Sequence, residues 1–530
     1  MYIESGLDIG PGMEISLPPY PTSIEYLLVA GGGGGGTLAG GGGGGFLTGT
    51  YNIPASATIT TTVGAAGAAA PSTYAAGGAG GNSSFVNDID IVKSGSVYLN
   101  GSNQYLTTPY NSAFDFGSND FTIEGWYNFT TFNGSGIDTL VILGNGEAGG
   151  PAYISCAWGI IYQSGGLKLV RYDAPPQTDY SLIFTPSTPL RTGAWYHVAC
   201  TKSGSDVRMF LNGYQVGATQ TTSNTYNSFN SNPLYVGSFQ NQGYLSNFNV
   251  SNLRIVKGVA VYTSNFTPSR NALTATQAAN VNGSPSAAIT GTQTSLLLNT
   301  VYGANYLKDS SSYNLAITNY NSATSQTLEP IYTVTSYGGG GGGGYSSYPN
   351  GVYGGSGGGG GGGTVGAGFV GQGYDGGLGF AAGQTGGGGG GAGGVGGGGG
   401  NITSGSGGIG AISAITGTSY YWAGGGGGSS SAVTGAPGGA GGGQGGLGTT
   451  IGAMGTGYNN ATTGGAGTNT GGGGGGHWYT STSNSGGSGI TVFRYPAIFN
   501  AASATTGSPI YSTVDGYRVY IFTSSGSITF

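Results

Sequence analysis

Uninterrupted runs of glycine constrain this chain more than any other feature. Glycine supplies 120 of the 530 residues, against an average usage of about 7%. Runs of five or more occupy 31–36, 40–45, 338–344, 357–363, 386–391, 396–400, 424–428 and 471–476. Glycine loses more conformational freedom on ordering than any other residue. Such runs are therefore either flexible linkers or parts of a cooperative, closely packed array.

The sequence around the runs favours the ordered array. The runs are not diluted with Ser, Glu or Lys, and apolar segments flank them at 24–30 and 490–495. A polyproline-II-type helix has three residues per turn, and its N–H and C=O groups all point outward. Without Cβ atoms, several such helices can approach one another and exchange hydrogen bonds. We therefore expect polyglycine II helices that pack as a bundle on a small β base.

The direction of the chain predicts which loops lie far from that base. The apolar segment 25–30 leads into 31–36, so 37–39 is a far turn and 40–45 returns. The same reasoning places loops 345–353, 429–437 and 477–485 at the far end. Loops at one end of a rigid scaffold often bind ligands, but their aromatic side chains could equally form a small core that caps the bundle. The candidate receptor-binding residues are Tyr345, Tyr348, Tyr353, His477, Trp478 and Tyr479.

Charge and hydropathy exclude several classes of protein. Charged residues make up 6% of the chain, and the net charge is −6, so a nucleic-acid binder, which should be basic, is not expected. No apolar run approaches the roughly 20 residues of a spanning helix, so membrane insertion is not expected. The first residues lack a basic segment followed by an apolar one. We therefore expect synthesis in a cytoplasm without a signal peptide.

The middle of the chain has the pattern of a β-sandwich. Segments such as FTIEGWYNF alternate, and in this one Phe121, Ile123 and Tyr127 share a face opposite Glu124 and Trp126. Short strands with frequent turn signals favour two packed sheets. The segments at 96–129, 192–217 and 232–269 resemble a laminin-G-like, concanavalin-A-like jelly roll. Members of that family bind glycans, proteins or calcium, and many are structural, so the fold alone does not identify the ligand.

The glycine-rich parts resemble a second family. EYLLVAGGGGGG, YTVTSYGGGGGGG, TNTGGGGGGHWY and GGSGITVFRYP are similar to the glycine-rich modules of tailed-phage adhesins. In that family polyglycine II helices form a bundle whose loops touch the host receptor. This resemblance covers roughly 22–86 and 331–497, on both sides of the predicted sandwich.

Together the two resemblances predict a jelly roll inserted into a discontinuous glycine-rich bundle. The fold class is mainly β with polyglycine II helices. The last segment is expected either to close the β base of its own module or to pair with a neighbouring subunit. The expected parts are an attachment arm (1–21), a first glycine-rich part (22–86), the sandwich with its extension (87–330), a second glycine-rich part (331–497) and a C-terminal β-hairpin (498–530).

Catalytic chemistry is not apparent. His197 has the place of an ordinary strand residue, and a glycosidase-like pair drawn from Asp120 and Glu124 has no particular support. Cys200 is expected in the core, and cytoplasmic synthesis favours free thiols at Cys156 and Cys200. We expect no cofactor. Calcium binding by Asp115, Asn119 and Asp120 is an alternative, although turn capping is the preferred role for these residues.

These inferences predict a virion protein of a tailed phage. It would be a tail-fibre or tail-tip adhesin, without enzyme activity, that binds a host glycan or outer-membrane protein. Its other partners would be virion tail proteins, and analogy with fibres suggests a homotrimer. One alternative is a structural virion protein without receptor contact, such as a fibre spacer or capsid decoration. A glycan depolymerase is a further alternative.

Overall fold

A computed structural model describes residues 20–530, with side chains, except for a set of internal segments. The segments outside the description are 54–56, 73, 88–94, 134–135, 147–153, 174–177, 187–188, 229–230, 240–243, 270–271, 282–283, 300–306, 327–332, 346–349, 431–467 and 478–483. The predicted attachment arm therefore lies almost entirely outside the described residues. Among the described residues, the helical elements are short 3₁₀ turns, and no helix is long and apolar enough to cross a bilayer.

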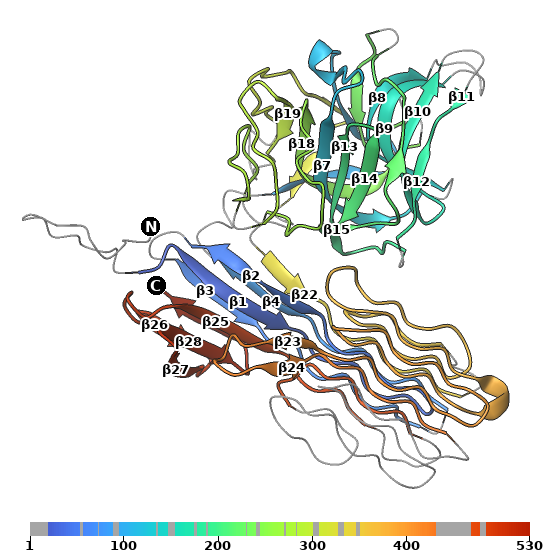
Figure 1. The fold of residues 1–530 in the computed structure, drawn as a ribbon, viewed down its shortest axis with the longest axis vertical. Helices are drawn as coiled ribbons and strands as arrows, with labels where there is room; N and C mark the ends of the chain where they lie inside the picture. Colours follow the sequence, from blue (N-terminus) through green and yellow to red (C-terminus); the bar gives the residue numbers. More distant parts are fainter. Residues whose placement is uncertain are drawn as a thin grey trace, which may run out of the picture.

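The sandwich consists of two antiparallel sheets (Figure 1). One sheet has the order β11 (Thr178–Asp179), β10 (Gly166–Asp173), β9 (Ile154–Gln163), β8 (Ile137–Gly146), β17 (Leu234–Val236), β6 (Tyr105–Thr108) and β20 (Thr318–Tyr320), and β12 (Leu182–Phe184) also pairs with β10. The other has the order β15 (Tyr214–Gln215), β14 (Asp206–Leu211), β13 (Trp195–Ser203), β7 (Phe121–Thr131), β18 (Asn247–Lys257), β5 (Ser96–Asn100) and β21 (Thr324–Gln326). In this second sheet β16 (Gln220–Thr221) pairs with β14, and β19 (Thr294–Leu298) pairs with β18.

The predicted alternation of β7 is confirmed. Phe121, Ile123 and Tyr127 lie in the core between the two sheets. The opposite face of β7 is buried as well, because the connection after β18 covers it, and Val259 O accepts a hydrogen bond from the Thr122 hydroxyl. Cys200 lies in the inter-sheet core as expected, and both cysteines are buried free thiols.

The β base also has two antiparallel five-stranded sheets. One has the order β2 (Phe46–Asn52), β1 (Ser23–Val29), β25 (Ile490–Pro496), β28 (Tyr517–Phe522) and β27 (Ile510–Val514). The other has the order β22 (Thr333–Ser336), β4 (Ser83–Asn87), β3 (Thr58–Thr62), β29 (Gly526–Thr529) and β26 (Ala504–Thr506). A core that includes Tyr26, Phe85, Phe493 and Phe522 packs between them. The C-terminal segment thus closes the base of its own module, with four strands where a single hairpin was predicted.

The sandwich is inserted between two paired strands of the base. Strand β4 precedes it in the chain and β22 follows it, and the two pair antiparallel from Ser83↔Ser336 to Val86↔Thr333. The ends of the inserted domain therefore lie side by side, which is the geometry that makes a domain insertion tolerable. Figure 1 shows the sandwich beside the base, and the glycine segments run away from the base.

The glycine segments exchange hydrogen bonds with three neighbours in turn. In the first segment the N–H groups of 31 and 34 donate to 81 and 78, those of 32 and 35 to 487 and 484, and those of 33 and 36 to 42 and 39, at N···O distances between 2.8 and 3.0 Å. The repeat of three residues matches the three residues per turn of a polyproline-II-type helix. Each segment thus satisfies its backbone polar groups through its neighbours.

Close approach, rather than unusual backbone angles, requires glycine here. A Cβ placed on Gly34 would lie 1.9 Å from the carbonyl oxygen of Ala68. Among the described residues of 31–45, none has a positive φ. In the edge segment 64–70 the buried positions recur every third residue: Gly64, Gly67 and Ala70 are buried, while Ala65 and Ala68 are exposed. The buried positions of this segment therefore carry only glycine or alanine.

Asp138 in β8 gives the sandwich a measurable pH dependence. Its side chain is buried, and both carboxylate oxygens accept from Asn133 N at 3.2 Å. Burial raises the pKa of Asp138 from 3.8 to about 6. The folded state then holds this proton more tightly than the unfolded state, so stability should fall as the pH rises from about 4 through about 6. In Asp138→Asn, melting temperatures between pH 4 and 8 should lose this decline, and an unchanged profile would contradict the assignment.

Candidate functional site

The far end of the glycine-rich module is one candidate site. His477 N donates to Gly36 O at 3.1 Å, and Thr37 N donates to Ala75 O at 3.2 Å, so separate segments turn at the same place. The 3₁₀ turn η3 (Ala381–Gly383) also lies there, because Gln384 Nε2 donates to the Tyr345 hydroxyl at 3.2 Å. Figure 1 shows this end opposite the β base.

The six candidate residues have different outcomes. Tyr345 lies at the far end as expected, half-buried. Its ring centre is 6.1 Å from that of Tyr74, an exposed residue that the sequence analysis missed. His477 also lies there, but it is buried, and burial lowers the pKa of its imidazole. Placing Tyr353 in a far loop is wrong. Outside the described residues lie Tyr348, Trp478 and Tyr479.

Tyr353 lies beside the sandwich because the chain turns back earlier than predicted. Val352 N donates to Gly341 O at 2.8 Å, so residues after 350 already return along 338–341. The guanidinium of Arg191, from the sandwich, stands over the Tyr353 ring at 3.9 Å from its centre. Tyr353 therefore belongs to the contact between the two modules. A cation over an aromatic face is stabilising.

A loop of the glycine-rich module, residues 367–373, makes the main part of this contact. Phe369 stacks on Tyr196 of the sandwich at 5.0 Å and belongs to its hydrophobic core. Arg191 Nη2 donates to Ala367 O at 2.9 Å, and Asn212 Nδ2 donates to Val370 O at 3.1 Å. The modules therefore share an apolar core and side-chain-to-backbone hydrogen bonds, which makes a packed interface between them.

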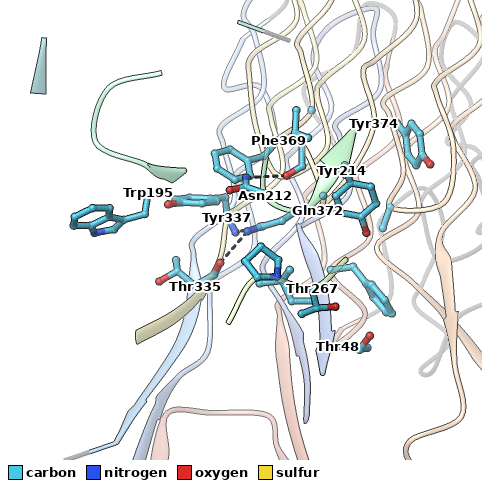
Figure 2. A pocket seen from close by; sticks show the side chains of 18 of the residues that line it. Thr48, Trp195, Asn212, Tyr214, Thr267, Thr335, Tyr337, Phe369, Gln372 and Tyr374 are labelled. Carbon is cyan, nitrogen blue, oxygen red and sulfur yellow. Dashed lines mark hydrogen bonds between the residues drawn. The ribbon is translucent and has the colours of Figure 1, made fainter. Parts of the chain in front are cut away.

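Beside this contact, both modules enclose a cleft of about 910 Å³ (Figure 2). Sandwich strands β7, β13 and β15 supply one wall, and the base strands with loop 367–373 supply the other. Gln372 holds the loop in place, because its Nε2 donates to Thr335 O at 2.9 Å and its Oε1 accepts from Tyr337 N at 2.8 Å. The cleft is a second candidate site, which the sequence analysis missed.

A buried charge cluster lies behind the sandwich wall of the cleft. The Glu124 carboxylate accepts from Arg254 Nε at 2.8 Å and Nη2 at 2.6 Å, and from the Tyr262 hydroxyl at 2.9 Å. His197 Nε2 lies 3.2 Å from the same carboxylate. Burial alone would raise the pKa of Glu124, but Arg254 and His197 lower it to about 2.

This geometry gives Glu124 a structural role. A carboxylate held ionised by a buried guanidinium is a poor general acid, so it does not supply the protonated member of a glycosidase pair. His197, expected as an ordinary strand residue, is in fact a buried partner of this cluster.

The predicted turn-capping acids contact backbone groups. Asp115 accepts from Ser228 N at 2.6 Å and is hydrogen-bonded to the Tyr110 hydroxyl. Asp120 accepts from Gly204 N at 2.7 Å. Within the described part of the chain no group of three or more His, Cys, Asp and Glu side chains could hold a metal ion.

Comparisons with known proteins agree with these two kinds of module. Residues 100–261 match the family model described as the concanavalin A-like lectin/glucanases superfamily. The chain contains a concanavalin A-like domain. Residues 11–166 match a model described as a glycine-rich domain, so that match runs from the first glycine-rich part into the sandwich. No curated protein matches the chain.

Solved structures give weaker likenesses. The carbohydrate-binding module CBM40 of a Ruminococcus gnavus IT-sialidase, bound to α2,3-sialyllactose, is 16% identical, with 32% of this chain and 94% of that chain covered and a TM-score of 0.24. A heptameric SAP-like pentraxin from Limulus polyphemus is 16% identical, with 32% and 79% covered and a TM-score of 0.23. At these scores the likeness carries no inference about ligand or activity.

Proposed function

We propose that this protein is an adhesin of a tailed-phage virion, located on a tail fibre or tail tip, that binds a host-surface glycan or outer-membrane protein. The observation that carries the proposal is that separate glycine segments turn together at one end, opposite the β base. A rigid platform with loops at a single end is a suitable arrangement for recognition. The phage origin, the partnership with other tail proteins and the trimer rest on the sequence resemblance.

The platform is proposed to be a polyglycine II bundle. The repeat of three residues in the hydrogen bonds of segment 31–36 supports this assignment. The close approaches support it too, since a Cβ at Gly34 or Gly41 would lie about 2 Å from a neighbouring carbonyl oxygen. Such a bundle would hold the described far-end residues, such as Tyr74 and Tyr345, in place before they meet a receptor, which reduces the entropy lost on binding.

Mutation of the two neighbouring far-end tyrosines, exposed Tyr74 and half-buried Tyr345, tests the adhesin directly. Tyr74→Ser with Tyr345→Ser removes two neighbouring aromatic side chains and leaves every glycine of the packed segments unchanged. Adsorption of labelled protein to cells that the virion infects should weaken by about tenfold or more, as for a lost binding hot spot. The matched control is Tyr313→Ser, which removes an exposed tyrosine of the sandwich. Equal adsorption of all three proteins would contradict a far-end receptor site.

The alternative functions give different results. A structural spacer adsorbs to no host cell, whichever tyrosine is present. A depolymerase releases reducing sugar from host glycan, whereas the adhesin leaves the glycan intact. Because the chain is poor in charge, adsorption should change little between about 50 and about 500 mM salt. A collapse of adsorption over that range would indicate electrostatic binding and contradict the proposed contact.

A further inference from the structure

The cleft between the modules has the size and wall chemistry of a ligand site. Its volume of about 910 Å³ is within the range of small-molecule sites, roughly 300–1,000 Å³. It is open to solvent at a mouth where Tyr214 and Tyr374 are each about half exposed, at 48% and 49%. Tyr214 comes from the sandwich and Tyr374 from the glycine-rich module, so neither module forms this mouth alone (Figure 2).

Aromatic side chains form a substantial part of the wall. Besides the two tyrosines at the mouth, Trp126 and Phe266 line the cleft, and both are buried. Buried groups fix these two rings: His197 packs edge-on against Trp126 at 5.2 Å and against Phe266 at 5.6 Å. Rigid aromatic faces provide contact area at a low cost in conformational entropy. They suit the apolar C–H face of a sugar ring.

Polar side chains also line the wall. Gln372 and Asn212 are occupied, since their side-chain amides hold the loop and the module contact. Asn128 in β7 also lines the cleft, and the residue is 5% exposed. A side-chain amide can both donate to and accept from a ligand hydroxyl.

The charge of the wall restricts the ligand further. Among the described residues that line the cleft, Asp375 is the only charged one, and its Oδ1 accepts from Gly368 N at 2.8 Å. The cleft thus offers no cation to an acidic ligand, and its one charge is negative. An anionic sugar such as sialic acid would enter without a counter-charge, which is unfavourable in a partly desolvated site.

We propose that this cleft binds a neutral oligosaccharide, with sugar rings stacked on Tyr214 and Tyr374 and a hydroxyl hydrogen-bonded to Asn128. The inference rests on the proposed function in so far as the receptor is a host glycan. It adds a site that the far-end loops do not contain. Insertion of the sandwich into the glycine-rich module would then create the binding site, because the two faces of the site come from different modules.

Binding of glycans to the intact protein tests the site. The probes are an array of neutral and acidic bacterial surface glycans, followed by calorimetry with the neutral oligosaccharides that bind. Tyr214→Ala with Tyr374→Ala should weaken binding by about tenfold or more, which corresponds to about 1.4 kcal/mol. Asn128→Ala should weaken it by several-fold. Tyr313→Ala, a change of similar exposure on another surface of the sandwich, should leave binding unchanged.

Conservative variants separate lost contact from lost folding. Tyr214→Phe with Tyr374→Phe keeps the ring faces, so it should bind within about threefold of the parent if stacking dominates. Binding of acidic glycans alone, or equal binding by the double alanine variant, would overturn the inference. If cells adsorb the protein but no glycan on the array binds it, the cleft inference fails while the proposed adhesin function stands. If neither cells nor glycans bind, the proposed function fails as well.

Discussion

Gly34→Ala is expected to destabilise the glycine-rich module severely, by about 3 kcal/mol or more, because overpacking costs this much where neighbours cannot move. The added methyl would lie 1.9 Å from Ala68 O and 2.5 Å from its carbonyl carbon. Both atoms belong to backbone, so no side chain can rotate away. The N–H of Gly34 also donates to Gly78 O, so a shift of this segment would break hydrogen bonds as well.

The matched control lies at the outer edge of the same module. At Gly398 a Cβ would meet no atom closer than 3.6 Å, and its φ is not positive. Gly398→Ala should therefore be neutral or stabilising by about 0.4–1 kcal/mol, since alanine lowers the entropy of the unfolded chain. Amide hydrogen exchange over 31–45 measures the difference: slow in the parent and in Gly398→Ala, fast in Gly34→Ala. Fast exchange in the parent itself would show that the glycine runs are flexible.

Glu124→Ala is expected to cost the sandwich about 3–5 kcal/mol, the usual loss when one partner of a buried ion pair is removed. Arg254 has a fully buried side chain, and its Nε and Nη2 both donate to Glu124. Without the carboxylate, a guanidinium remains buried with no counter-charge. Thermal or urea unfolding, followed by tryptophan fluorescence, measures the loss.

The double variant distinguishes a buried pair from general fragility. Glu124→Met with Arg254→Met removes both charges and keeps the volume, so it should be more stable than either single variant. Acid should destabilise the sandwich by protonating the Glu124 carboxylate. The pKa of Glu124 is lowered from 4.5 to about 2, so its contribution is complete above about pH 4.5 and is lost as the pH falls toward 2. A double variant no better than the singles would contradict this account.

The cluster also connects stability with the cleft. His197 lies between the Glu124 carboxylate and the rings of Trp126 and Phe266. Loss of the carboxylate should therefore loosen the aromatic wall before the sandwich unfolds. The variant Glu124→Gln, tested below its unfolding temperature, should bind glycan more weakly than the parent.

Local sequence predicted several parts of the fold well. The alternation of Phe121, Ile123 and Tyr127 identified the core face of β7, because side chains of one strand alternate between faces. The far turn at 37–39 followed from chain direction. The same reasoning failed at Tyr353, because glycine residues at 351 and 354–355 already return along a neighbouring segment. A usable signal was present in GAAGAAA at 64–70, where the small buried positions recur every third residue.

By itself the sequence determined that glycine runs without Cβ atoms must either pack on one another or stay loose, and that the middle folds as a sandwich. Both follow from local steric and hydrophobic patterns. Only the tertiary structure decided that Phe369 enters the sandwich core, that Glu124 meets Arg254, and that Tyr214 and Tyr374 flank one cleft. These contacts join residues 130 or more positions apart, and sequence periodicity carries no information about such distant pairs.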